Sequence, residues 1–129
     1  MTIAAKWLAA SGASVCELGN GTATWQSDLD APMGNPAIPN PHDLLDSALA
    51  ACTVLTLQIY AKRKTYDLQE IHVSVTHEET PGAYKLIRHI ELHGDLSPTV
   101  REDLLRVANK CPIHKSLSAQ ITIDTTLAA

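Results

Sequence analysis

The chain has 129 residues, a length that fits one domain with one hydrophobic core, and we expect residues 1–129 to form that single domain. Its formal net charge of -4 argues against a broad nucleic-acid surface, so no nucleic-acid partner is predicted. We see no targeting segment and no apolar window that approaches the length of a bilayer span. These observations predict a cytoplasmic protein without membrane contact.

The N-terminal part of the sequence predicts a hairpin and a long loop. Two short β-like segments, residues 14–18 and 22–26, flank Gly19-Asn20-Gly21, and Asn-Gly between such segments favours a tight turn. Residues 28–40 are rich in Pro, Gly, Asp and Asn and are predicted to form a loop.

A helix is predicted over residues 41–64, with Asn40 as its N-cap and Pro41 at its first position. From Leu44 to Ala61 the helix is apolar on nearly every side, which is typical of a helix buried at the centre of a structure. A chain this short cannot enclose about six helical turns, so a partner subunit is expected to cover part of it. The basic residues 62–64 complement the negative end of the helix.

The rest of the chain predicts two strands, a helix, a short helical turn and a last strand. The strands cover residues 71–77 and 86–92, joined by Thr80-Pro81-Gly82. Ser97 and Pro98 begin the second helix, and Pro112 ends it. Residues 113–117 suit a helical turn, and residues 119–125 alternate as a strand. This order of elements predicts an α+β fold with antiparallel sheets around the long central helix.

Cysteine thiols are the strongest candidates for chemistry. Three cysteines make no disulfide framework, and in a reducing compartment each is a buried apolar residue, a metal ligand or a reactive thiol. Cys52 lies among leucines in the long helix, where an inert buried thiol is the simpler interpretation. Cys111 lies near Lys110 and His114, a positive setting that favours a thiolate. Cys16 is interpreted as structural.

Metal and nucleotide chemistry find less support in the sequence. Cys111 and His114 have a spacing compatible with two metal ligands, but no second pair accompanies them, so no metal is predicted. Four histidines alternate on the two middle strands and are interpreted as solvent-facing or satisfied positions, with no metal cluster expected: His72, His77, His89 and His93. His42 lies in the first turn of the long helix, where a role near the cap is expected. No phosphate loop or dinucleotide fingerprint is present, and no cofactor is predicted.

Two motifs together resemble the OsmC/Ohr superfamily of osmotically inducible and organic hydroperoxide resistance proteins. The first is Asn40-Pro41-His42-Asp43-Leu44-Leu45 followed by Ala48-Leu49-Ala50-Ala51-Cys52-Thr53, which resembles the family's central-helix motif. The second is Lys110-Cys111-Pro112-Ile113-His114-Lys115-Ser116-Leu117, which resembles its second cysteine motif and precedes a similar last strand. The match covers nearly the whole chain.

The resemblance implies an OsmC-like fold, an intertwined homodimer and a thiol peroxidase active in oxidative-stress defence. In that family the cysteine matching Cys52 attacks an organic hydroperoxide and becomes a sulfenic acid. The cysteine matching Cys111 then forms a disulfide with it, and an external dithiol reduces the disulfide.

The sequence departs from the family pattern at the residues that activate the first thiol. His42 stands where the characterised peroxidases carry a glutamate, and no arginine precedes Arg63. Candidates for the missing positive charge or for lining the site are Arg88, Lys62, Arg63, His42 and His114, and Asp43 is a further candidate for site lining. Two alternatives remain open: a non-enzymatic dimer that binds a small apolar ligand at its interface, and a metal-binding protein using Cys111 and His114.

Overall fold

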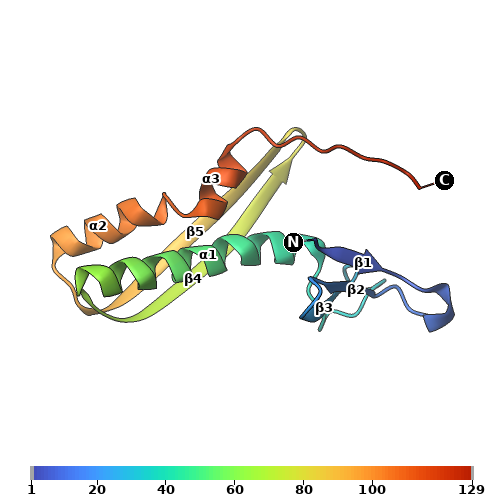
Figure 1. The fold of residues 1–129 in the computed structure, drawn as a ribbon, viewed down its shortest axis with the longest axis horizontal. Coiled ribbons are helices and arrows are strands. Elements are labelled where there is room, and N and C mark those ends of the chain that lie inside the picture. The colour runs from blue at the N-terminus through green and yellow to red at the C-terminus, as the bar shows by residue number, and fades with distance from the viewer. Residues whose placement is uncertain (1, 129) are drawn as a thin grey trace. The chain divides into compact units, whose positions relative to one another are not determined.

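A computed structural model describes residues 2–128 of the chain, which divide into two compact units (Figure 1). The boundary falls within helix α1 (Pro41–Lys64), between Leu45 and Asp46. The first unit carries a small three-stranded sheet. The second carries a two-stranded sheet and three helical segments, including most of α1.

The first unit contains the predicted hairpin and one strand that sequence reasoning missed. Strands β2 (Cys16–Gly19) and β3 (Thr24–Ser27) pair antiparallel, and the side chain of Asn20 accepts hydrogen bonds from the amides of Thr22 and Ala23 in the turn. Strand β1 (Ala4–Lys6) adds to the edge of β2, and a 3₁₀ turn, η1 (Ala9–Ser11), follows it. Three residues are too few to show a period of two, so the sequence gives no signal for β1.

The predicted loop is ordered by one carboxylate. Asp28 accepts hydrogen bonds from the hydroxyl of Ser14 at 2.6 Å and from the amides of Asn35 and Leu29 at 2.9 and 2.8 Å. These donors, the Ser14 hydroxyl foremost, lower the pKa of Asp28. The loop therefore has a defined path to the start of α1.

Helix α1 has the predicted bounds and begins in a capping box. The Asp43 amide donates to the Asn40 side chain at 2.8 Å, and the Asp43 carboxylate accepts from the Asn40 amide at 3.0 Å. Within the single chain the helix buries one stripe, at every fourth position: Leu49, Thr53, Leu57 and Ala61. Leu55 and Ile59, on other faces, remain about half exposed, so one chain alone does not enclose the helix.

The expectation that no apolar window approaches the length of a bilayer span is wrong for this helix. An 18-residue window of α1 has a mean hydropathy of 1.5, and the helix is long and apolar enough to cross a bilayer by length and composition. Its Thr, Ser and Gln residues interrupt the apolar run without lowering the mean enough to exclude a span. Core helices of water-soluble proteins have the same composition, so this feature alone decides nothing.

Strands β4 (Asp67–Thr80) and β5 (Ala83–Asp95) form a long antiparallel hairpin around the predicted Pro81-Gly82 turn. Both extend well beyond the predicted bounds. Their side chains alternate along most of both strands, with one face turned to the helices and the other exposed. A bulge between Leu68 and Glu70 shifts the register near the end of the hairpin.

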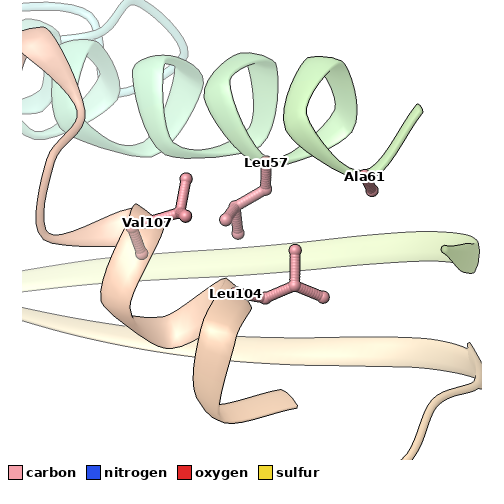
Figure 2. Close-up of a cluster of buried hydrophobic side chains, with 5 residues drawn as sticks. Leu57, Ala61, Leu104 and Val107 are labelled. Carbon is pink, nitrogen blue, oxygen red and sulfur yellow. The ribbon is translucent and has the colours of Figure 1, made fainter. Parts of the chain in front are cut away.

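The core of the second unit lies between α1, α2 (Pro98–Ala108) and the inner face of the hairpin. Ser97 caps α2 by accepting a hydrogen bond from the Val100 amide, as predicted. Figure 2 shows side chains of α1 and α2 pointing toward one another over the strands. The buried cluster consists of Leu57, Ala61, Leu104, Val107 and Ala108.

The end of the chain agrees with the prediction in part. Helix α3 (Pro112–Ser118) contains the predicted helical turn over residues 113–117 and has Cys111 as its N-cap. The predicted strand over residues 119–125 is wrong for the single chain, because the described part of this segment has no regular structure. The segment alternates, but a strand also needs a neighbouring strand to satisfy its backbone, and β1 to β5 pair only among themselves.

Asp103 of α2 is a polar junction beside this core. Arg106 pairs with its carboxylate at 2.6 Å, and the hydroxyls of Tyr66 and Tyr60 each donate to it at 2.7 Å. These groups, Arg106 first, hold the pKa of Asp103 well below its usual range, and the hydrogen bond to Asp103 raises the pKa of Tyr66 to about 12. The ionised carboxylate thus joins α2 to α1 and to the start of β4.

We expect the Asp103 junction to make folding stability depend on acidity. Because the folded-state pKa of Asp103 is lowered, its contribution is present above the ordinary carboxyl pKa of about 4 and is lost as pH falls toward the folded-state value. Urea unfolding between pH 5 and pH 2 should show a steeper loss of unfolding free energy for the native chain than for Asp103→Asn. Parallel losses in the two proteins would contradict this role.

Candidate functional site

Arg88, on the inner face of β5, is the centre of the candidate site. Its guanidinium lies within hydrogen-bonding distance of three helical segments. The partners are the hydroxyl of Thr53 in α1 (3.0 Å), the carbonyl of Ala108 (3.3 Å) and the side chain of Asn109 (3.0 Å) at the end of α2, and Nδ1 of His114 in α3 (3.1 Å). A rigid fork of N–H donors suits such a multiple contact.

Cys111 is fully buried at the turn between α2 and α3. Its amide donates to the carbonyl of Ala108, which is also an acceptor for Arg88. Its Sγ accepts a hydrogen bond from the backbone amide of His114 at 3.3 Å. Cys111 is therefore held by two residues that both contact the Arg88 guanidinium.

Cys52 directly precedes Thr53, the residue of α1 that contacts Arg88. It is half-buried, with Sγ 3.9 Å from the hydroxyl of Thr56. The next residue, Thr53, is fully buried; its hydroxyl donates to the carbonyl of Leu49 at 2.7 Å and accepts from Arg88. Sequence reasoning missed Thr53, although a threonine within an otherwise apolar helical stripe signals a polar contact.

A cavity of about 240 Å³ opens next to Arg88 and His114. Apolar side chains from α1, β5 and α3 complete most of its wall: Leu49, Leu86 and Leu117, together with the ring of Tyr84. An apolar wall with a guanidinium and an imidazole suits a small molecule with an organic group and one polar end.

A second polar group near the cavity was also missed. The carboxylate of Asp46 contacts Nδ1 of His77 at 2.5 Å and accepts from the hydroxyl of Tyr84 at 3.1 Å. The rings of His77 and Tyr84 stack with centroids 5.0 Å apart. His77 is thus a partner of the cavity-lining tyrosine, not an isolated surface residue.

The predicted site residues separate into two groups. Arg88, His114 and Cys111 come together, and Arg88 also contacts Thr53, which follows Cys52 in the sequence. Asp43 serves the capping box of α1, and His42 lies in the same first turn. Lys62 and Arg63 lie in the last turn, as their capping interpretation predicts. The metal alternative loses support, because Nδ1 of His114 faces the Arg88 cation.

Comparisons with known proteins identify the family of the chain. The family model described as OsmC-like protein matches residues 34–126, so the chain belongs to the OsmC-like family. No curated protein sequence matches it.

Solved structures share the fold at low sequence identity. An OsmC-like protein from Mycoplasma pneumoniae is 23% identical, with a TM-score of 0.74 over 90% of this chain and 85% of that one. An organic hydroperoxide resistance protein OsmC from Legionella pneumophila is 24% identical, with a TM-score of 0.64 over 92% and 90%. The organic hydroperoxide resistance protein OhrB of Bacillus subtilis is 21% identical, with a TM-score of 0.59 over 91% and 89%.

We expect Arg88→Lys to destabilise the second unit. A lysine ammonium cannot make the forked contacts, and the Thr53 and Ala108 acceptors lose their charged donor, which costs about 1–3 kcal/mol of unfolding free energy. The matched control is Arg101→Lys, because Arg101 is exposed and donates to one carbonyl, that of Leu92. Its effect should stay within about 0.5 kcal/mol in the same urea titration. Equal effects would contradict the bridging role of Arg88.

Proposed function

We propose that the protein is a cysteine-based peroxidase that reduces organic hydroperoxides in oxidative-stress defence in the cytoplasm. Membership of the OsmC-like family and neighbours named as organic hydroperoxide resistance proteins support this activity. The observation that carries the proposal is the Arg88 network: the guanidinium contacts Thr53, the residue after Cys52, and His114, whose amide donates to Cys111. The thiolate is the nucleophilic form of cysteine.

The proposed reaction uses both thiols and no cofactor. The Cys52 thiolate attacks the terminal oxygen of the hydroperoxide and the O–O bond breaks, leaving Cys52 as a sulfenic acid and an alkoxide that takes a proton to become the alcohol. The thiolate of Cys111 then attacks the Cys52 sulfur, and hydroxide leaves with a proton as water. Exchange of this disulfide with an external dithiol restores both thiols and oxidises the dithiol.

Arg88 takes the role that the family assigns to an arginine upstream of the helix. This chain has no arginine before Arg63, and Arg88 reaches α1 from β5 instead. His114 contacts the same guanidinium and lines the cavity, where the organic group of the hydroperoxide would bind. Asp43 fixes the start of α1, and His42 is proposed to line the site of the second subunit.

We further propose that the working form is an intertwined homodimer of single-domain subunits. The family match over residues 34–126 spans parts of both units, which supports their acting as one domain. The exposed flank of α1 and the unpaired segment over residues 119–125 both lack the contacts that such sequences normally make. A second copy would supply an apolar cover for the first and a strand edge for the second.

The dimer should be visible in sedimentation. The native chain is expected to sediment as a dimer at micromolar concentration, because the half-exposed Leu55 and Ile59 forfeit part of the roughly 1.5–3 kcal/mol that full burial of each side chain contributes. Leu55→Asp should shift the population to monomer or aggregate. Thr76→Asp, which places the same charge on an exposed strand position, should leave the dimer intact. A folded, soluble native monomer would refute the proposal.

A non-enzymatic ligand-binding dimer is the second candidate. The half-buried position of Cys52 among apolar neighbours and the cavity of about 240 Å³ favour it. In that case a small apolar molecule with one polar end would occupy the cavity beside Arg88, and Cys52 would serve packing.

Peroxide consumption with an external dithiol distinguishes the two candidates. The native chain should consume an organic hydroperoxide, and Cys52→Ser should reduce the rate to background because the nucleophile is gone. Cys16→Ser is the matched control and should leave the rate unchanged. After one equivalent of peroxide without dithiol, peptide mapping should find Cys52 linked to Cys111 and Cys16 free. Linkage through Cys16, or equal activity of Cys52→Ser, would exclude this mechanism.

A further inference from the structure

The exposed face of the β4–β5 hairpin carries a compact group of histidines and carboxylates, which we call the His–Glu patch. In the register of the hairpin, Glu70 lies opposite His93 and His72 lies opposite Glu91. Residues two apart on a strand share a face, so all four side chains lie on the same exposed face. Arg88 lies on the opposite, inner face, which separates the patch from the cysteines.

The bulge in β4 helps to place these side chains. It restarts the alternation, so that Leu68 and Ile71 both face the core while Glu70 and His72 face outward. Gly94, the partner of Leu68, has φ +148°, and a Cβ there would come within 1.9 Å of the Asp67 carbonyl oxygen. A residue with a side chain would therefore disturb the backbone that presents Glu70 beside His93.

Three ligand atoms of the patch converge. Those of Glu70, His72 and His93 all lie within 4.8 Å of one another. Nε2 of His72 is 3.0 Å from the Glu70 carboxylate, and the rings of His72 and His93 meet edge to face with centroids 5.5 Å apart. Nε2 of His93 is 3.5 Å from the Glu91 carboxylate.

Ion pairing explains only part of this geometry. An exposed Glu–His pair within one strand contributes little, and protonation of both histidines would make their close approach repulsive. A metal ion explains the convergence, because neutral imidazoles and a carboxylate then share one positive charge centre.

We propose that Glu70, His72 and His93 bind one divalent transition-metal ion, with Zn²⁺ as the best match. Zinc takes nitrogen and oxygen ligands at about 2.0–2.2 Å, which in a tetrahedron separates neighbouring donor atoms by about 3.4 Å. Nε2 of His72 and the Glu70 carboxylate are 3.0 Å apart, near that spacing, and all three ligand atoms lie within 4.8 Å of one another. Glu91 or water supplies the fourth position, and the bound ion clips β4 to β5.

Protons compete with a metal ion for the His72 imidazole. The hydrogen bond from His72 lowers the pKa of Glu70, which therefore is ionised at neutral pH, and the hydrogen bond to Glu70 raises the pKa of His72. Metal binding must displace a proton from His72 whenever it is charged, so the affinity should fall as pH is lowered through the histidine range.

Zn²⁺ titration of the native chain against a chromophoric chelator tests the proposal. One ion should bind per chain, and His72→Gln or His93→Gln should weaken binding by at least about 10-fold, since loss of a direct ligand costs no less than loss of an outer-sphere partner. His89→Gln is the matched control: it changes a histidine on the same exposed face that is not in the His–Glu patch, and it should leave the affinity unchanged.

Two further readouts keep the result unambiguous. Zn²⁺ should raise the thermal midpoint of the native chain and of His89→Gln, but not of His72→Gln, while the three should have equal midpoints in EDTA. The Co²⁺ form should lack thiolate charge-transfer absorption. Absence of binding, equal affinity in all three variants, or a Co²⁺–thiolate spectrum that assigns the ion to Cys111 would overturn the proposal. None of these outcomes depends on peroxidase activity.

Discussion

The contacts of one guanidinium organise the second unit around the cysteines. Arg88 projects from β5 and meets α1 at Thr53, the end of α2 at Ala108 and α3 at His114. Each of these acceptors belongs to a segment that carries or adjoins a thiol. Because the guanidinium is planar and always charged, it holds the three segments at fixed mutual positions. These contacts fix the surroundings of Cys111 and of Thr53, the residue after Cys52.

Two faces of helix α1 have different surroundings in the single chain. The stripe through Thr53 and Leu57 belongs to the core of the chain, where Leu104 of α2 packs against it. The flank that bears Leu55 and Ile59 stays about half exposed in the single chain. An amphipathic helix satisfied by its own chain would carry polar residues there. The composition of α1 therefore suits a helix that packs on its own chain on one face and on a second subunit on the other.

The two faces of the β4–β5 hairpin carry different groups of polar side chains. Its inner face carries Arg88 toward the thiols, and its outer face carries the His–Glu patch to solvent. This separation is possible because successive side chains of a strand point to opposite faces of the sheet. In the proposed peroxidase this separation is useful, since a transition metal bound next to the thiols would compete for their sulfur atoms.

The sequence by itself determined the local structure: the capping box of α1, the Pro98 and Pro112 boundaries, the hairpin turns and the OsmC-like motifs all depend on neighbouring residues. Only the tertiary structure decided which distant side chains meet. Arg88 and Thr53 are 35 residues apart, and nothing in their local sequence relates them. The same reason explains the predicted last strand: alternation over residues 119–125 is a local property, whereas pairing requires an edge that the single chain does not supply. Glu70 and His93 meet because a bulge and Gly94 set the register, a feature of the pairing and not of either strand alone.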